Sequence, residues 1–313
     1  GIQVGVSIAL LIKKPVESRK AKIYYARVGE DWRKEAKYDF LNQQKAYQNI
    51  EWREVDPDVH QIWLTEGLQS EFHNFIPMGG KEEKSAKSVV EGVIFKIFSN
   101  GVKTNRDVWT YNFNRDALAA NVQRTIEFYN EQVFKWNRLK DKPKVDDFVG
   151  YDDARISWSE SLKNSLQHNI LAQFDADKVR VSLYRPFSKL SLYFDRIFNE
   201  RVYLFPLIYP RSIQENENKT ICISGVGSNK PFHVLMTNII PCLDSLEKTQ
   251  CFPFYAYTED GQNRRENITD WALIHFCHHY RDSAIGKWDI FHYTYGLLHH
   301  SDYRRKYAAN LRR

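Results

Sequence analysis

Five short polar stretches contain the side chains best suited to chemistry in this sequence. Each combines Arg or Lys with Asn, Ser or Thr, and each lies beside a segment expected to form a strand. Arg and Asn bind the edges of guanine and adenine through paired hydrogen bonds, whereas Lys, Ser and Thr bind phosphates. The candidate DNA-binding residues are Lys103, Thr104, Asn105, Arg106, Arg185, Lys189, Arg201, Asn229, Lys230, Asn263, Arg264 and Arg265. Loops are polar in most proteins, so one stretch alone is weak evidence, but five of them on a basic chain favour contact with DNA.

No complete catalytic constellation accompanies these stretches. His275 and His279 have the spacing of two ligands on one helix face, but ordinary core or surface histidines fit the same pattern. The segment Gly225–Lys230 resembles a phosphate-binding loop only weakly, because it lacks a third Gly and a Gly-Lys-Ser/Thr ending. We therefore expect a β-turn there, and we predict no catalytic residue, metal site or cofactor site in this chain.

The composition fits a globular protein with a polyanionic partner. The 313 residues are 42% hydrophobic and 14% aromatic, which is enough for a substantial core. Lys and Arg exceed Asp and Glu by 45 to 39, which gives a net charge of +6. This balance suits nucleic acid, although a solvated lysine-rich surface would give the same count.

Cysteine usage and hydropathy predict a cytoplasmic protein. The cysteines Cys222, Cys242, Cys251 and Cys277 show no CxxC pairing and follow no secretion signal, so we expect free thiols in a reducing compartment. No apolar run approaches the roughly 20 residues that a membrane span requires. The chain starts with Gly rather than Met, and we expect it to be a piece of a longer protein.

Hydrophobic periodicity predicts an α+β fold with mixed β-sheets and a helical C-terminal cluster. At the N-terminus, Ile2–Lys13 and Lys22–Val28 are expected to form a hairpin that completes a larger sheet. The other expected strands are Ile50–Val55, Val93–Phe98, Val108–Phe113, Lys178–Leu183, Leu190–Phe194, Thr220–Ser224 and Phe252–Tyr257. The expected helices are Asp31–Gln48, a long helix capped by Asn114, Ser159–Ile170, Thr269–Tyr280, Trp288–His299 and a last helix capped by Ser301.

The stretch Cys251–Tyr307 has the densest mixture of aromatic, basic and histidine residues, and it could be either core or recognition surface. Its large apolar residues recur at helical spacing, which favours a packed core. They are Trp271, Phe276, Trp288, Phe291, Tyr295 and Leu298. We therefore expect this stretch to support the recognition loops rather than to contact DNA, apart from residues 263–265.

Several longer motifs resemble one family of restriction-modification enzymes. Ser99–Phe113 resembles the Gly-hydrophobic-x-Thr-Gly segment that follows the methyltransferase core in fused enzymes of this kind, with Asn105 in place of the second Gly. The other motifs are Tyr184–Phe187, Lys230–Phe232, Gln250–Pro253, Glu266–Trp271 and Asp289–His300. From about Trp52 to its end, the chain resembles the C-terminal specificity domain, or target recognition domain, of type ISP single-polypeptide restriction-modification enzymes.

The resemblance implies how the chain is divided and what it works with. Residues 1–50 would be the terminal strands and helix of an N6-adenine methyltransferase-like domain, and residues 51–313 the specificity domain. In these bacterial-type defence enzymes, an endonuclease, a helicase-like ATP motor and the methyltransferase precede the specificity domain in the chain. The implied partners are double-stranded DNA and the upstream methyltransferase and motor domains. S-adenosylmethionine, ATP and Mg would serve that parent enzyme, since the Asn-Pro-Pro-Tyr and glycine-rich cofactor motifs are missing from this sequence.

Three hypotheses of function follow. The leading one is a module that recognises a double-stranded DNA sequence and directs N6-adenine methylation and ATP-dependent cleavage by upstream domains. The second is an intramolecular scaffold that packs on the methyltransferase and motor without itself contacting DNA. The third is a hydrolase whose site has no familiar motif.

Overall fold

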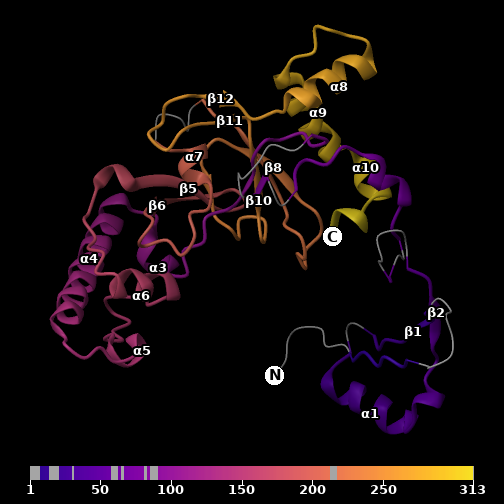
Figure 1. Ribbon diagram of the computed structural model, residues 1–313, viewed down its shortest axis with the longest axis horizontal. Helices are drawn as coiled ribbons and strands as arrows, with labels where there is room; N and C mark the ends of the chain where they lie inside the picture. The colour runs from indigo at the N-terminus through magenta and orange to yellow at the C-terminus, as the bar shows by residue number, and fades with distance from the viewer. Residues whose placement is uncertain are drawn as a thin grey trace. The chain divides into compact units, whose positions relative to one another are not determined.

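The computed structural model describes residues 8–13, 21–29, 32–57, 63–64, 67–80, 83–84, 91–211 and 217–312. The chain divides into two compact units, Gly1–Glu66 and Gly67–Arg313. Helices and mixed sheets occur together in the second unit, so the predicted α+β class is confirmed (Figure 1).

The first unit is a small antiparallel strand pair with one helix. Its elements are β1 (Ile23–Tyr25), α1 (Lys34–Gln44) and β2 (Arg53–Val55). Ile23 lies opposite Val55 in the pair. The helix and the second strand agree with the sequence-based prediction.

The structure corrects the predicted N-terminal hairpin. Strand β1 pairs with β2, which lies later in the chain, and not with the described residues 8–13. Residues 8–13 form no strand, and Leu10 and Leu11 are exposed. Residues 2–7 of the predicted hairpin lie outside the described part of the chain.

Among the described residues, two four-stranded sheets form the centre of the second unit. The strands are β3 (Ser99–Asn100), β4 (Tyr111–Asn112), β5 (Val179–Arg185), β6 (Ser188–Tyr193), β7 (Thr220–Ile223), β8 (Val234–Thr237), β9 (Ile240–Pro241), β10 (Gln250–Pro253), β11 (Tyr255–Ala256) and β12 (Arg265–Glu266). One sheet has the order β4-β6-β5-β9 and is mixed, because β5 pairs antiparallel with β6 and parallel with β9. The other has the order β3-β10-β7-β8 and is antiparallel. A short pair, β11-β12, continues the chain beyond β10.

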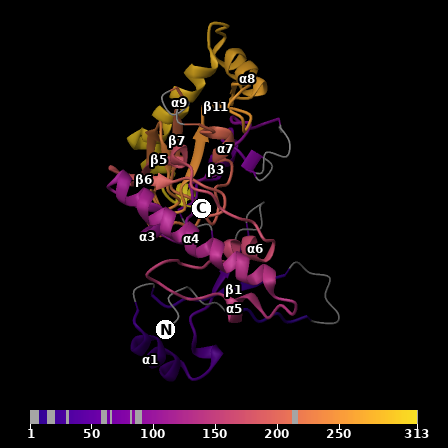
Figure 2. The ribbon, with the colours of Figure 1, turned by 90° about the vertical axis from the view of Figure 1, so that its left-hand side faces the viewer.

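Helix α4 (Arg115–Arg138) has the long apolar face that its sequence predicts. The predicted cap is confirmed, because Asn114 Oδ1 accepts a hydrogen bond from Ala117 N at 2.9 Å. The apolar residues predicted at helical spacing are buried: Leu118, Val122, Ile126, Tyr129, Val133 and Trp136. They form a core with α6 (Glu160–Gln167), with the first residue of β5 and with the last residue of β6. Helix α4 lies alongside these elements (Figure 2).

The C-terminal cluster consists of three helices, which are α8 (Asp270–Tyr280), α9 (Lys287–His299) and α10 (Ser301–Lys306). Of the six apolar residues predicted as core in this stretch, Phe291 and Leu298 are buried in one cluster with Phe252 and Phe254 of the β10 region, and the other four are partly buried against it. The Phe254 and Trp288 rings stack with their centroids 3.5 Å apart. The stretch is therefore packed core, as predicted, although His300 rather than Ser301 occupies the N-cap of α10.

Two predicted strands differ from the structure. Val93–Phe98 is irregular because its backbone bonds to separate segments: Ile94 N donates to Pro77 O at 3.0 Å, and Lys96 N donates to Asn267 O at 2.7 Å. The predicted strand Val108–Phe113 is mostly the short helix α3 (Asp107–Thr110), and only its last part forms β4.

Candidate functional site

The sheet β3-β10-β7-β8 gathers several predicted loops at one of its ends, which we call the loop end. Gln250, the first residue of β10, pairs with Asn100 in β3 and with Ile223 at the end of β7. The loops that follow β3 and β7, and the loop that precedes β10, therefore leave the sheet at the same end. The first two contain the predicted residues 103–106 and 229–230.

The end of strand β5 lies against the same loops. Tyr184 Oη donates to Asp107 Oδ2 at 2.9 Å, and Arg185 Nη1 lies 3.6 Å from Cys242 Sγ. Cys242 in turn touches Gly101, where an added Cβ atom would come within 2.5 Å of the Cys242 carbonyl oxygen. Gly at this position allows the two backbones to approach so closely. The β5–β6 turn thus belongs to the loop end.

A backbone bridge joins the two loops that carry Lys103 and Arg201. Lys103 N donates to Arg201 O, and Arg201 N donates to Lys103 O, both at 2.9 Å. The bridge borders a hollow of about 500 Å³. The hollow is lined by Lys103, Asn105, Trp158, Ser159, Glu160, Glu200, Arg201 and Tyr203. Two cations, an amide, two aromatic rings and two carboxylates therefore line one space, and the rings offer surfaces on which nucleobases can stack.

Arg106 lies beneath this hollow and not on its surface. Only 3% of its surface is exposed, and its guanidinium donates to Ser157 O at 3.1 Å, to Phe198 O at 2.5 Å and to Ser159 Oγ. Burial lowers the pKa of Arg106 to about 10, partly offset by the charge of Glu200, so the side chain stays charged at neutral pH. Because all three of its guanidinium nitrogens are hydrogen-bonded within the protein, this placement favours a positioning role for Arg106 over the predicted DNA contact.

The adjacent residues Thr104 and Asn105 have different roles in this loop. Thr104 is buried, and its hydroxyl binds Asp107 Oδ1 and accepts a hydrogen bond from Arg106 N at 3.2 Å, so it shapes the loop. Asn105 is exposed and has a φ of +55°, a left-handed conformation that Asn adopts more easily than most residues. This explains why Asn can replace Gly in the motif, and it leaves the Asn105 amide free to face a ligand.

Glu200 makes the hollow mixed in charge. Burial disfavours its charged form, but hydrogen bonds from Ser159 and Ser161 and the charge of Arg201 outweigh burial and lower the pKa of Glu200. The carboxylate is thus held within the protein. The Arg201 guanidinium remains about half exposed, with Nη1 donating to Glu200 O at 2.8 Å. It is the more accessible of the two arginines at this site.

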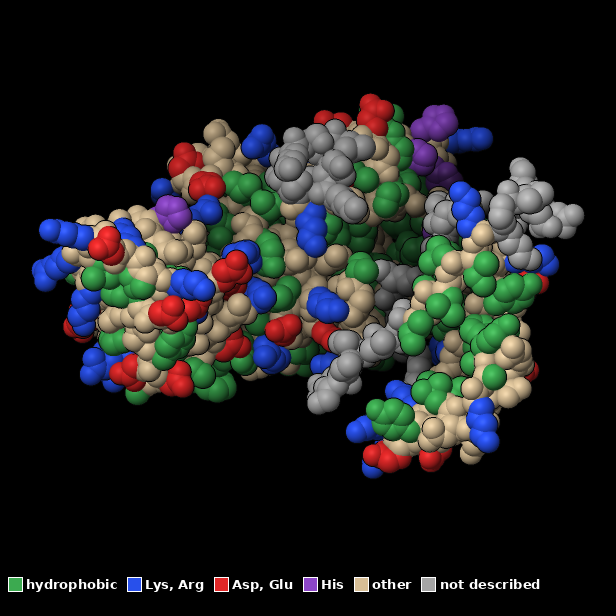
Figure 3. Space-filling model, turned by 60° about the horizontal axis from the view of Figure 1, so that its bottom comes forward, with side chains coloured by type: hydrophobic (Ala, Val, Ile, Leu, Met, Phe, Trp, Pro, Cys, Tyr) green, Lys and Arg blue, Asp and Glu red, His purple; other side chains and the backbone are tan. Residues whose placement is uncertain are grey.

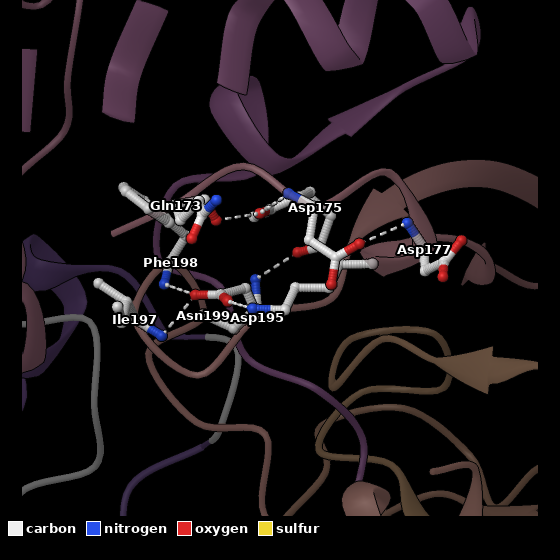
Figure 4. A network of polar contacts seen from close by, with 9 residues as sticks. Gln173, Asp175, Asp177, Asp195, Ile197, Phe198 and Asn199 are labelled. Carbon is white, nitrogen blue, oxygen red and sulfur yellow. Dashed lines mark hydrogen bonds and ion pairs between the residues drawn. The ribbon is translucent and has the colours of Figure 1, made fainter. Parts of the chain in front are cut away.

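A second polar network fixes the loop that carries Arg201 (Figure 4). Asp195 Oδ1 accepts hydrogen bonds from Ile197 N at 2.7 Å and Phe198 N at 3.2 Å, while Lys178 Nζ lies 2.6 Å from Oδ2. The side chain of Asn199 closes the same turn, accepting from Asp195 N at 3.1 Å. Since both side chains are buried, the loop enters the site in a fixed conformation.

We expect the variant Asp195→Ala to unfold with a free energy lower by about 2–3 kcal/mol, because two amide groups and Lys178 lose a charged partner. Urea unfolding followed by circular dichroism measures the change. Asp195→Asn is the matched control, because it keeps an acceptor for the amides and loses only the ion pair. A loss as large in Asp195→Asn as in Asp195→Ala would show that the ion pair, and not the turn, carries the effect.

The β5–β6 turn presents predicted residues and one that sequence reasoning missed. Lys189 is exposed on β6, and Arg185 is half-buried with its guanidinium 4.0 Å from the ring centroid of Tyr184. Phe187, between them, is 98% exposed. The sequence contains a signal for it, an aromatic residue directly after Pro in a short turn, but such a residue is equally compatible with burial.

The loop after β7 is a turn, as predicted, and it is bonded to the loop before β10. Ser228 N donates to Gly225 O at 3.1 Å, and Gly227 has a φ of +75°. The Glu247 carboxylate accepts from Ser228 Oγ at 2.7 Å and from Lys230 N at 3.2 Å, and the Ser228 bond in particular lowers the pKa of Glu247. The predicted residues Asn229 and Lys230 are both exposed at this turn.

The remaining three predicted residues lie away from the loop end. Asn263 and Arg264 lie just before β12, which pairs with β11. Strand β11 follows the end of β10 that is opposite to the loop end. Arg264 is bound to Glu217 at 2.8 Å and lies over the Tyr255 ring. Arg265 and Asn263 are exposed. The structure thus brings four of the five predicted stretches together and leaves this one apart.

The face of the molecule seen in Figure 3 is not uniformly basic. Lys and Arg side chains are interspersed with Asp, Glu and hydrophobic side chains (Figure 3).

Within the described ranges, no group of three His, Cys, Asp or Glu residues could hold a metal ion, and no helix there is long and apolar enough to cross a bilayer.

Comparison with protein families gives a match over most of the chain. Residues 93–313 match the model of the Type ISP C-terminal specificity domain. A comparison with curated proteins gives no match. The family match covers every loop of the site described above.

Solved structures agree with the family match. The chain is similar to a cryoEM structure of a DrdV–DNA complex, with 37% identity and a TM-score of 0.79 over 93% of this chain and 28% of that one. It is similar to a nuclease-deletion mutant of the Type ISP restriction-modification enzyme LlaGI in complex with a DNA substrate mimic, with 29% identity and a TM-score of 0.75 over 93% of this chain and 21% of that one. The ATP-dependent Type ISP enzyme LlaBIII bound to DNA shares the fold, with 23% identity and a TM-score of 0.77 over 96% of this chain and 19% of that one. The chain thus spans less than a third of the length of each of these proteins.

Proposed function

Because the chain belongs to the Type ISP C-terminal specificity domain family, we propose that it recognises a target sequence in double-stranded DNA. The observation that carries the proposal is the convergence of four polar stretches at one end of a rigid sheet. Similar proteins bound to DNA, the DrdV complex and the LlaGI mutant with its substrate mimic, support it.

The exposed and half-buried residues of the loop end divide into two kinds of contact. Asn105 and Arg201 border the hollow with accessible donors and acceptors of the kind that bind base edges. Lys103, Lys189 and Lys230 present ammonium groups suited to phosphates. Arg106 and Thr104 act through these residues by holding the loop in shape. Sequence discrimination would then depend mainly on the first kind and affinity on the second.

We propose further that this recognition directs N6-adenine methylation and ATP-dependent cleavage by other domains of a longer enzyme. The exposed apolar residues 8–12 support packing against an upstream methyltransferase-like domain, of which residues 1–50 would be the last part. S-adenosylmethionine, ATP and Mg would be bound by those other domains, because the motifs that would hold them do not occur in this sequence. A cytoplasmic location fits this role.

Selection from a library of random duplexes tests the proposal. We expect the chain to enrich one sequence class and to bind it at least a thousandfold more tightly than scrambled duplex, as specific DNA-binding proteins do. The measurement is fluorescence anisotropy at several salt concentrations. Absence of enrichment at any salt concentration would contradict the proposal and favour an intramolecular scaffold that packs on the methyltransferase and motor.

A further inference from the structure

The apex of the β5–β6 turn has an unusual conformation for its sequence. Arg185 pairs with Ser188, so Pro186 and Phe187 form a two-residue loop, and the strand register shifts just before it. Phe187 has a φ of +66°. With Pro fixing the first central position, a positive φ at the second defines a type II turn, which normally has Gly or Asn there. A bulky aromatic residue in this conformation is a backbone outlier.

The ring of Phe187 gains nothing from this strain within the protein. It is 98% exposed, whereas Gly or Asn at this position could form the same turn without exposing an aromatic ring. Strained residues persist where a function requires them, and an exposed ring at a rigid apex is suited to insertion into a partner. The fold therefore holds an apolar group outward at a cost in stability.

The surroundings of Phe187 indicate a polyanionic partner. Residues 179–194, which form the hairpin, include Arg180, Arg185 and Lys189 and no acidic residue. Arg180 is buried, but the half-buried Arg185 and the exposed Lys189 flank the apex in the sequence, one on each strand of the hairpin. An apolar protein surface would gain little from these flanking charges, whereas phosphates on both sides of a base step would pair with them.

We propose that Phe187 is a wedge that inserts between adjacent base pairs of the bound DNA, partly unstacks them and kinks the duplex. Apolar side chains inserted in this way bend DNA and let more protein surface contact it. Arg185 and Lys189 bind phosphates beside the opened step. The wedge rests on the proposed DNA recognition and adds to it a specificity for base steps that unstack easily.

The test compares Phe187→Gly, Phe187→Trp and Phe134→Ala with the unaltered chain. Phe187→Gly removes the ring and relieves the backbone strain, so its thermal midpoint is expected at or above that of the unaltered chain. Phe187→Trp keeps a large ring. Phe134, which is 52% exposed on α4 and distant in sequence from every loop of the site, gives a matched loss of an exposed Phe.

The probes are duplexes of the selected target sequence with 2-aminopurine at successive positions, and with a donor and acceptor dye at their ends. We expect the unaltered chain to raise 2-aminopurine fluorescence at one step and to shorten the end-to-end distance. Phe187→Gly should lose both signals and bind about tenfold to a hundredfold more weakly, as expected for a lost base stack. Phe187→Trp and Phe134→Ala should retain both signals.

The outcomes separate the wedge from DNA recognition itself. If Phe187→Gly binds as tightly as the unaltered chain with the same fluorescence, the wedge is wrong, DNA recognition stands, and Phe187 is left as a protein contact. If binding weakens but no step of the duplex shows unstacking with the unaltered chain, Phe187 contacts a groove and insertion is wrong. If the unaltered chain enriches no duplex at all, the proposed function and the wedge both fail.

Discussion

We expect the free energy of unfolding of the variant Arg106→Ala to be about 3–5 kcal/mol lower than that of the unaltered chain. This is the usual cost of removing one partner from a buried charged network. The Arg106 guanidinium binds Ser157 O, Phe198 O and Ser159 Oγ, and Ser159 in turn donates to Glu200. Its removal leaves the carbonyl groups without these donors and takes away one of the two cations beside Glu200, the other being Arg201. Urea unfolding at neutral pH measures the loss.

Two variants show whether the effect belongs to the buried guanidinium. Arg106→Lys keeps the positive charge but cannot make the same fork of hydrogen bonds, so most of the stability loss should remain. Arg201→Ala removes the exposed arginine of the same site and should change stability by less than about 1 kcal/mol. A stable Arg106→Ala variant that loses discrimination between target and scrambled DNA would restore Arg106 as a base contact and overturn the role assigned to it here.

Local sequence patterns predict the helices well because their residues bury one face against a single neighbouring surface. In α4, six apolar residues at helical spacing and the Asn114 cap determine both the start of the helix and its buried side. The alternation in Val93–Phe98 was misleading, since this segment is held by Asn267, which lies 170 residues away and binds both Ile97 N and Ile97 O at 2.8 Å. Such long-range bonds leave no trace in a local pattern.

The candidate site, like the fold, was only partly predictable from the sequence. The residue types of the loops indicate cations and amides, but they do not distinguish the buried Arg106 from the accessible Arg201. That difference arises from carbonyl groups on distant segments, such as Phe198, which pair with one arginine and not the other. The convergence of the loops depends on the order β3-β10-β7-β8, which no single strand sequence encodes. The sequence identified the candidate loops, but the order of the strands in the sheet decides which of these loops lie at the same end.

The largest effect on DNA affinity is expected from salt. Of the predicted cations, Lys103, Lys189, Lys230 and the half-buried Arg185 are the four assigned to phosphates at the loop end. If each of the four neutralises one phosphate, the slope of log affinity against log salt concentration is about −3.6, and affinity falls roughly a hundredfold between 50 and 200 mM salt. Fluorescence anisotropy with the selected duplex measures this slope.

Paired substitutions at the two ends of the sheet show where the DNA lies. Lys103→Ala with Lys230→Ala should make the slope shallower by about 1.8, since two phosphate contacts are lost. Arg264→Ala with Arg265→Ala removes the same formal charge from the opposite end and should leave the slope unchanged. Because both pairs alter the net charge equally, a general electrostatic effect would change the two slopes alike. A change confined to the Arg264 and Arg265 pair would instead place the DNA along the β11–β12 end and contradict the site assigned from the convergence of the loops.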